Sequence, residues 1–219
     1  MKKVKGIIFD MDGLIFDTET VYYQASQTTA DKLGFPYSKA EYLKYLGISD
    51  EELWAAYHEV YAEFGSEKVQ QFIDEAFAES NRMIANGEVA VKPGLFDLLT
   101  YLNEAQIPKI IASSNQRQVI DAILAVSDLQ AEFPEIVSFE NVKRAKPNPE
   151  IFELAAKRLG LAKDEILVLE DSPNGVLAAE AAGIPVIMIP DLIAPSAELR
   201  EKTVAVLPSL SEVVTFLEK

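Results

Sequence analysis

Two aspartates near the start of the chain have the spacing of a nucleophile and an acid–base partner. Residues 6–9 are a short apolar run whose length and β-branched content predict a buried parallel strand. Asp10 and Asp12 follow where that strand must end, and Gly13 permits the turn. At the carboxyl end of a strand, one carboxylate can attack as a nucleophile and a second can move protons. The alternative is a solvated acidic turn, and the rest of the chain decides between the two.

Polar residues also follow two later apolar runs that are predicted to be strands. These groups are Ser113, Ser114 and Asn115 after residues 107–112, Glu170 and Asp171 after residues 165–169, and Lys146 before a capped helix. The carboxyl ends of parallel strands lie at one edge of a sheet. We therefore expect these groups and the two N-terminal aspartates to converge on one crevice.

Clustered carboxylates repel one another unless a cation joins them. Oxygen ligands with little or no nitrogen favour Mg²⁺, which keeps waters and binds substrate phosphate. Lys146 and the Ser113 hydroxyl could then hold an anion beside the metal. A nucleophile, a metal, a cation and a hydroxyl together indicate phosphoryl transfer.

Each group alone also has an inert interpretation. The Ser113–Asn115 segment could be a plain loop, and Lys146 could be a solvated lysine with Lys143 as its rival. The run ILVLED is similar to the acidic strand of nucleotide-hydrolysing proteins, but the chain contains neither GxxxxGK[ST] nor GxG. The combination of the groups, in this order, is more specific than any one of them.

The composition excludes several other classes of function. The chain has 219 residues, 49% hydrophobic and 25% charged, as in a soluble globular protein of one or two domains. Its formal charge of −15 argues against nucleic acid or an anionic membrane as a partner. It has no cysteine, so thiol nucleophiles and cysteine-ligated metals are excluded, and a lone histidine, His58, cannot build a multi-histidine site. No apolar run is long enough for a signal peptide or a membrane span, and we expect a cytoplasmic protein. The sequence makes no prediction of oligomeric state.

Strand and helix patterns alternate from residue 91 onward, which predicts a doubly wound parallel sheet of the Rossmann-like α/β class. The expected strands are 6–9, 107–112, 136–139, 165–169, 185–189 and 204–207. The expected helices begin near Gly94, Gln118, Asn148, Ser172 and Ser211, with Asn148 as an N-cap.

Residues 18–88 interrupt this alternation with a helical, aromatic segment. Residues 49–52 form a capping box, Gly65 is expected to end one helix, and Ser66 is expected to cap the next. Phe77 is expected on the apolar face of that second helix. We interpret the segment as a small helical bundle inserted into the α/β domain, with most of its aromatic residues in the core of the bundle.

Four motifs together resemble the haloacid dehalogenase-like hydrolase superfamily, in its subgroup of β-phosphoglucomutase-like phosphatases with a helical cap. The motifs are DMDGLIFDTE, IIASSN, KPNPEIF and LEDSPNGVLAAEAAG, which span nearly the whole chain. The resemblance implies an α/β hydrolase core of residues 1–17 and 89–219 and a cap domain of residues 18–88.

The resemblance also implies roles for individual residues. It implies Asp10 as the nucleophile and Asp12 as the general acid and base, with Ser113, Ser114, Asn115 and Lys146 binding the substrate phosphate. It implies Mg²⁺ held by the Asp10 carboxylate, the Asp12 main-chain oxygen and Asp171, with Glu170 contributing directly or through water.

Three functions agree with these residues. The first is a Mg²⁺-dependent phosphomonoester hydrolase that acts on a small phosphorylated metabolite through an aspartyl-phosphate. The second is a sugar phosphomutase of the β-phosphoglucomutase type, and the third is a non-enzymatic receiver phosphorylated on Asp10. Asp12 favours phosphate esters, because an alkoxide leaving group needs a proton whereas a halide does not. Receivers resemble the site but lack a helical insertion after the first strand.

The cap segment favours hydrolysis over the mutase reaction. Family mutases resemble this chain around LGISDEEL but carry an arginine where Asp50 stands, and a histidine in place of Tyr22. Arginine binds a second phosphate in a bidentate manner, whereas an aspartate repels it. Tyr22, Asp50 and Trp54 are the cap residues that we nominate to contact the substrate.

Overall fold

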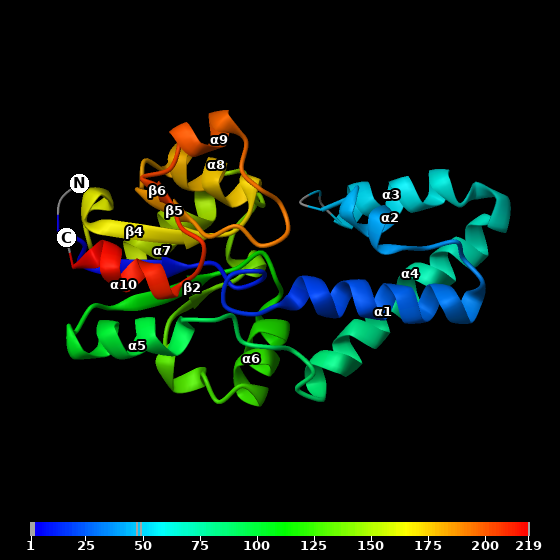
Figure 1. Ribbon diagram of the computed structural model, residues 1–219, viewed down its shortest axis with the longest axis horizontal. Coiled ribbons are helices and arrows are strands. Elements are labelled where there is room, and N and C mark those ends of the chain that lie inside the picture. The colour runs from blue at the N-terminus through cyan, green and yellow to red at the C-terminus, as the bar shows by residue number, and fades with distance from the viewer. Residues whose placement is uncertain (1–2, 47, 49, 219) are drawn as a thin grey trace. The chain divides into compact units, whose positions relative to one another are not determined.

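The computed structural model describes residues 3–46, 48 and 50–218, with Asp50 described in its backbone only. The chain divides into two compact units, Met1–Asp17 with Ala90–Lys219, and Thr18–Val89. The first unit alternates strands with helices and the second is helical (Figure 1). Val89, which we expected in the α/β segment, groups with the helical unit.

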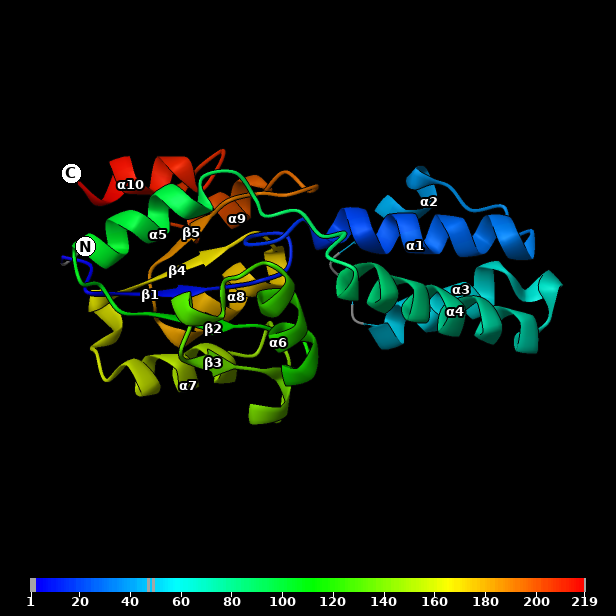
Figure 2. The same ribbon diagram turned by 90° about the horizontal axis from the view of Figure 1, so that it is seen from below.

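A parallel sheet forms the centre of the α/β unit (Figure 2). Its strands are β1 (Gly6–Phe9), β2 (Lys109–Ala112), β3 (Ile136–Val137), β4 (Ile166–Glu170), β5 (Val186–Met188) and β6 (Ala205–Val206). Their order is β3-β2-β1-β4-β5-β6, and each neighbouring pair is parallel. The chain runs outward from β1 through β2 to β3, returns to β4 on the other side of β1, and continues in the opposite direction through β5 to β6. The topological switch point therefore lies between β1 and β4. The predicted Rossmann-like, doubly wound fold is confirmed.

Helices cover both faces of the sheet because alternate side chains of buried strands point to opposite faces. The helices of this unit are α5 (Leu95–Glu104), α6 (Arg117–Val126), α7 (Glu150–Leu159), α8 (Pro173–Ala182), α9 (Ala197–Glu201) and α10 (Ser211–Leu217). Short 3₁₀ turns are Gln130–Glu132, Phe139–Asn141 and Lys163–Glu165. Ile8, Ile110 and Val168 pack in one buried cluster with side chains of α7 and α8. Figure 2 shows α5 and α10 together on the opposite side of the sheet.

Local capping explains where the helices beside the strand ends begin. The Ser172 hydroxyl accepts the backbone N–H of Gly175 at 3.1 Å, and Pro173 occupies the first turn of α8, as the sequence predicts. Asn148 is not the N-cap of α7, because Pro149 holds that position and the Asn148 side chain accepts the Glu150 N–H. Strand β3 is shorter than residues 136–139, because Phe139 begins a 3₁₀ turn.

The helical unit has an aromatic core. Its helices are α1 (Thr18–Leu33), α2 (Lys39–Leu43), α3 (Asp50–Val60) and α4 (Ser66–Ala85), with α1 packed along α4. Phe72 of α4 is fully buried, stacks on Phe35 at 4.9 Å and meets Tyr57 at 5.5 Å between ring centroids. The hydroxyls of Tyr37 and Tyr57 share a hydrogen bond of 2.9 Å, so the polar atoms of these rings are satisfied inside the core.

Four expectations for this unit are corrected or lie outside the described residues. Gly65, at φ 83°, is the N-cap of α4, and Ser66 is the first residue of that helix instead of its cap. A 3₁₀ turn, Ala62–Phe64, separates α3 from Gly65. Phe77 is exposed and not on the buried face. The capping box at residues 49–52 includes Ser49, which lies outside the described residues.

Among the helices described in the structure, none combines the length and the apolar composition that crossing a bilayer requires.

Two phenylalanines of α4, one buried and one exposed, allow a test of the aromatic core. Phe72→Ala removes a ring that is fully buried among other rings, and we expect a loss of about 3–5 kcal/mol in the free energy of unfolding of the helical unit. Phe77→Ala is the matched control on α4, because Phe77 is 59% exposed and should change stability by less than about 0.5 kcal/mol. Urea unfolding followed by the fluorescence of Trp54, which lies in this unit, measures both. Equal losses for the two variants would contradict the assignment of the core.

Candidate active site

The predicted site residues of the α/β unit meet at the carboxyl edge of the sheet. Asp10 follows β1, and its N–H donates to the Leu169 carbonyl of β4 at 3.0 Å. Glu170 is the last residue of β4, and Asp171 follows it. These acids therefore stand beside one another at the topological switch point because β1 and β4 are neighbours in the sheet.

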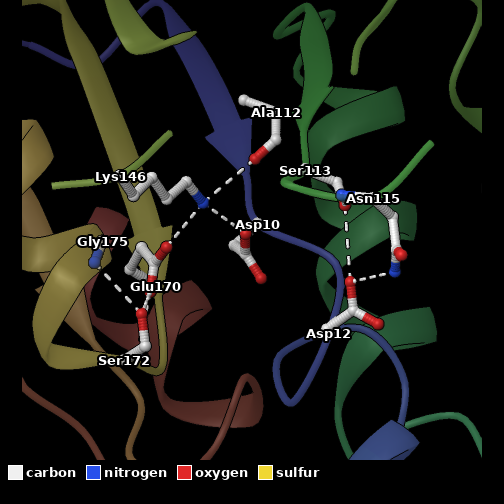
Figure 3. Close-up of polar contacts among 9 residues, drawn as sticks. All are labelled: Asp10, Asp12, Ala112, Ser113, Asn115, Lys146, Glu170, Ser172 and Gly175. Atoms are coloured by element: carbon white, nitrogen blue, oxygen red, sulfur yellow. Dashed lines mark hydrogen bonds and ion pairs between the residues drawn. The ribbon is translucent and has the colours of Figure 1, made fainter. Parts of the chain in front are cut away.

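Lys146 enters this cluster from the segment before α7 (Figure 3). Its ammonium donates to Asp10 Oδ1, to Glu170 Oε1 at 2.7 Å and to the Ala112 carbonyl at 3.2 Å. Its side chain is 6% exposed, and the ammonium also lies 4.8 Å from the centroid of the Phe152 ring. Lys143, the rival that the sequence allowed, is exposed, so Lys146 is the one of the two that reaches Asp10 and Glu170.

Asp10, Glu170 and Asp171 form a group that could hold a metal ion. Each offers a carboxylate oxygen, and these oxygens lie within 4.8 Å of one another. Asp10 and Glu170 are buried, and Asp171 is partly buried. In the described part of the chain, a single ammonium, that of Lys146, is hydrogen-bonded to this group. The donor set is all oxygen and carries an excess of negative charge, which fits a hard divalent cation such as Mg²⁺.

The electrostatics of the cluster agree with this charge excess. Burial raises the pKa of Asp10 to about 7 from an ordinary value of 3.8, and Lys146 offsets only part of that rise. Burial, followed by repulsion from Glu170 and Asp10, also raises the pKa of Asp171 well above its usual range. For Lys146, burial lowers the pKa, but attraction to Asp10 and Glu170 outweighs it and the net pKa is raised. The lysine is therefore charged, and the acids favour a bound cation or protons.

Asp12 is held apart from the lysine by the segment after β2. Its Oδ2 accepts from Asn115 Nδ2 at 2.8 Å and from Ser113 Oγ at 3.4 Å. Figure 3 shows Asp10 between the Lys146–Glu170 pair on one side and the Asp12–Asn115 pair on the other. The two aspartates therefore have different partners, a cation for Asp10 and neutral donors for Asp12, which suits two different chemical roles.

The segment after β2 positions its own residues. The Ser113 N–H donates to the Val137 carbonyl of β3 at 3.0 Å, and its hydroxyl accepts the Asn115 N–H at 3.0 Å. Ser113 is fully buried, whereas the neighbouring Ser114 is exposed. Ser113 and Asn115 are thus brought to Asp12, and Ser114 points to solvent from the same turn.

Glu170 is oriented by the first turn of α8. Its Oε2 accepts the Ser172 N–H at 2.8 Å and the Ser172 hydroxyl at 2.9 Å. A Cβ on Gly175 would collide with the Glu170 carboxylate, so a glycine is required for the helix to approach this closely. Sequence reasoning did not assign Ser172 or Gly175 to the site, although both lie in the fourth motif.

A further acid at this edge, Asp191, was missed in the sequence. It follows β5 in the run VIMIPD, so the signal was available, namely an acidic residue just beyond a predicted strand. Its Oδ1 accepts the Lys92 ammonium at 2.6 Å, and it adds to the repulsion that raises the pKa of Asp171.

The residues nominated to contact the substrate lie on helices of the helical unit. Tyr22 is partly buried on α1, and Trp54 on α3 is 41% exposed. The side chain of Asp50 lies outside the described residues, so its predicted role is not addressed by the structure. His58 lies 3.3 Å from the Gln70 side chain, between its Nε2 and Oε1 atoms.

Comparisons with known proteins agree with this geometry. Residues 7–189 match the model of the haloacid dehalogenase-like hydrolase family. The chain is 30% identical over 182 residues to a phosphorylated carbohydrates phosphatase of Thermotoga maritima, covering 83% of this chain and 82% of that one. It is 33% identical over 195 residues to hexitol phosphatase A of Escherichia coli, covering 85% and 83%.

A solved structure from Thermotoga maritima, described as a candidate β-phosphoglucomutase, superposes with a TM-score of 0.83 at 28% identity, covering 98% of this chain and 99% of that one. The family match spans most of the chain, including all four sequence motifs, and the two relatives named above are phosphatases. The predicted resemblance and enzyme class are therefore confirmed, and the chain belongs to the haloacid dehalogenase-like hydrolase family.

Proposed function

We propose that the protein is a Mg²⁺-dependent phosphatase that hydrolyses a small phosphorylated metabolite through a phosphoryl group carried on Asp10. The observation that carries this proposal is the position of Asp10, whose carboxylate contacts the Lys146 ammonium and also belongs to the acid cluster with Glu170 and Asp171. A carboxylate in this setting can attack phosphorus, while the ammonium beside it attracts the oxygens of an anionic group. Two relatives named as phosphatases of phosphorylated carbohydrates and hexitols support a sugar or polyol phosphate as the substrate class.

Each residue has a defined part in the proposed reaction. An Asp10 oxygen forms a bond to phosphorus as the bond from phosphorus to the ester oxygen breaks, and protonated Asp12 gives its proton to that leaving oxygen. In the second half, the Asp12 carboxylate takes a proton from water as the water attacks the phosphoryl group, which frees Asp10 and phosphate. Asn115 holds the Asp12 carboxylate through its side-chain hydrogen bond in both halves.

The remaining groups would bind the phosphoryl oxygens and the metal ion. Lys146 and Ser113 would bind the phosphoryl oxygens, with Ser114 and Asn115 in the same turn. The Asp10 carboxylate, the Asp12 main-chain oxygen, Asp171 and Glu170 would hold Mg²⁺, because they supply oxygen ligands and excess negative charge. When bound, Mg²⁺ supplies positive charge that neutralises the acids and draws electrons from the phosphate. In this arrangement residues 1–17 and 90–219 form the catalytic core, and residues 18–89 form a cap that selects the substrate through Tyr22, Asp50 and Trp54.

The first prediction concerns the nucleophile. Asp10→Asn should lower phosphate release from p-nitrophenyl phosphate at least about a thousandfold, because a neutral amide cannot attack phosphorus, and each tenfold loss corresponds to about 1.4 kcal/mol of barrier. The matched control is Asp121→Asn, which removes an exposed acid paired with Arg117 on α6 and should leave the rate within twofold. Steady-state rates with saturating Mg²⁺ measure both variants, and an Asp10→Asn rate within tenfold of wild type would disprove the assignment.

The same preparation distinguishes hydrolysis from the mutase reaction. Sugar phosphates followed by phosphorus NMR should yield inorganic phosphate, with no interconversion of β-glucose 1-phosphate and glucose 6-phosphate. Efficient interconversion stimulated by the bisphosphate would favour the mutase reaction. The mutase is tested because one similar solved structure is described as a candidate β-phosphoglucomutase.

The second prediction concerns proton transfer. Asp12→Asn keeps a carbonyl oxygen for Asn115 and the main-chain oxygen for the metal, but it cannot supply or take a proton. With p-nitrophenyl phosphate, whose leaving group needs little protonation, we expect a burst of one equivalent of nitrophenolate followed by turnover slowed about 10²–10⁴-fold. An alkyl phosphate should show no burst. Equal losses in the first step for both esters, measured by rapid mixing, would exclude Asp12 as the acid.

The third prediction concerns the metal and pH. Because the pKa of Asp10 is raised to about 7, the folded protein binds this proton more tightly than the unfolded chain does. The metal-free protein should therefore lose stability as the pH rises from about 4 through 7. Mg²⁺ should raise the melting temperature by several degrees at pH 8 and by less at pH 5, because protons replace the metal at low pH.

Asp171→Asn should abolish most of this rise, and sodium chloride at equal ionic strength should not reproduce it. Differential scanning fluorimetry in a chelating buffer, with and without Mg²⁺, makes the measurement. A melting temperature that does not respond to millimolar Mg²⁺ at pH 8 would contradict a carboxylate metal site.

A further inference from the structure

Asp191 has a buried carboxylate oxygen that is left without a partner. The side chain is 9% exposed, and Oδ1 accepts the Lys92 ammonium at 2.6 Å. Oδ2 is buried and has no hydrogen-bond partner among the residues that the structure describes. Leaving an oxygen of an acidic side chain buried and unsatisfied is costly, so a group outside the polypeptide is expected at this position.

The unpartnered oxygen faces the acid cluster across Gly13. Asp191 lies just beyond β5, at the sheet edge that carries Asp10 and Glu170. Asp171 Oδ2 and Asp191 Oδ2 both lie within 4 Å of the point that a Cβ on Gly13 would occupy, with Asp191 Oδ2 at 3.4 Å. Gly13, at φ 74°, carries no Cβ, so the Asp171 carboxylate can lie where a Cβ would otherwise stand, on the side that Asp191 Oδ2 faces.

Lys92 fixes Asp191 relative to the turn after β1. The Lys92 N–H donates to the Ile15 carbonyl at 2.8 Å, so the backbone of this lysine is attached to the turn that begins at Asp12. The Lys92 ammonium at the same time holds Asp191 Oδ1. The lysine therefore sets the distance between the Asp191 carboxylate and the residues after β1, and it leaves Oδ2 as the oxygen that faces Asp171.

We infer that Asp191 is a positioning residue for the metal site, whose Oδ2 accepts a hydrogen bond from a water molecule of the bound Mg²⁺. This inference rests on the Mg²⁺ site of the proposed function. Mg²⁺ in proteins keeps several waters, and acceptors beyond the direct ligands orient those waters and tune affinity. A buried water is stable where two or more unsatisfied polar groups meet, and Oδ2 supplies one of them. Asp191 is not part of the group of direct ligand oxygens, Asp10, Glu170 and Asp171, found among the described residues, so a contact through water is the role left to it.

Isothermal titration of Mg²⁺ into the metal-free protein, without substrate, tests the inference. Asp191→Asn keeps the shape of the side chain but removes its charge, and it should raise the dissociation constant for Mg²⁺ by about 10–100-fold. Glu180→Gln is the matched control, because Glu180 is an exposed acid paired with Lys202 at 2.8 Å and its loss changes the net charge equally. Its dissociation constant should stay within twofold of wild type.

Two further variants make the outcomes separable. Lys92→Met leaves the carboxylate but removes its anchor, and it should weaken Mg²⁺ binding by about 3–10-fold; it also provides the test if Asp191→Asn does not fold. Asp171→Asn removes a proposed direct ligand and should abolish binding. If wild type binds Mg²⁺, Asp171→Asn does not, and Asp191→Asn binds as wild type does, the inference is overturned while the proposed function stands. If wild type binds no Mg²⁺, both fail.

Discussion

The ion pairs of the Lys146 ammonium with Asp10 and Glu170 hold the site together. Both acids lie at the ends of neighbouring central strands, and burial of either carboxylate without a partner would cost several kcal/mol. One ammonium spans them and also donates to the Ala112 carbonyl, so it links the ends of β1, β4 and β2. The Lys146 ammonium therefore connects the carboxyl ends of three strands through one charged group.

The charges of this centre do not balance, because its carboxylates outnumber the ammonium that contacts them. One ammonium faces the carboxylates of Asp10, Glu170 and Asp171, and repulsion and burial raise the pKa of Asp10 and Asp171. A formal charge of −15 for the whole chain makes an anionic substrate harder to attract. A divalent cation bound by this group would answer both features, because it would neutralise the acids and offer an anionic substrate a positive site. Binding of metal and binding of phosphate are thus expected to support each other.

The residues around this centre are arranged by backbone and capping contacts, which keep functional side chains rigid. Ser172 caps α8 and at the same time holds Glu170, while Gly175 allows the helix to approach the carboxylate. Ser113 receives the Asn115 N–H and reaches Asp12. Such contacts fix the proposed reacting groups at strand ends, where small errors in position would be costly to catalysis. In the helical unit, uncharged aromatic side chains pack together and hold the helices in place.

The sequence by itself determined the features that depend on local pattern. Alternating apolar runs predicted every strand of the sheet, with β1 matched residue for residue, and Ser172 predicted the start of α8. The motif residues Asp10, Asp12, Lys146, Glu170 and Asp171 were found because each follows a strand or precedes a capped helix. Local pattern failed where two short-range preferences compete, as at Asn148 and Ser66, where neighbouring residues took the N-cap. It failed also at Phe77, whose helical spacing predicted burial but whose side chain is exposed.

Only the tertiary structure decided which of these groups touch. The choice of Lys146 over Lys143 depends on which side chain reaches Asp10 across 136 residues of chain. The pairing of Lys92 with Asp191 joins residues 99 positions apart, and neither belongs to a motif. One carboxylate oxygen of Asp191 accepts the Lys92 ammonium, whereas the other is buried beside Gly13 and the Asp171 carboxylate with no hydrogen-bond partner among the described residues. Local sequence encodes propensity and strand ends, whereas charge balance in a buried site is set by which distant strands become neighbours, and that is a property of the folded sheet.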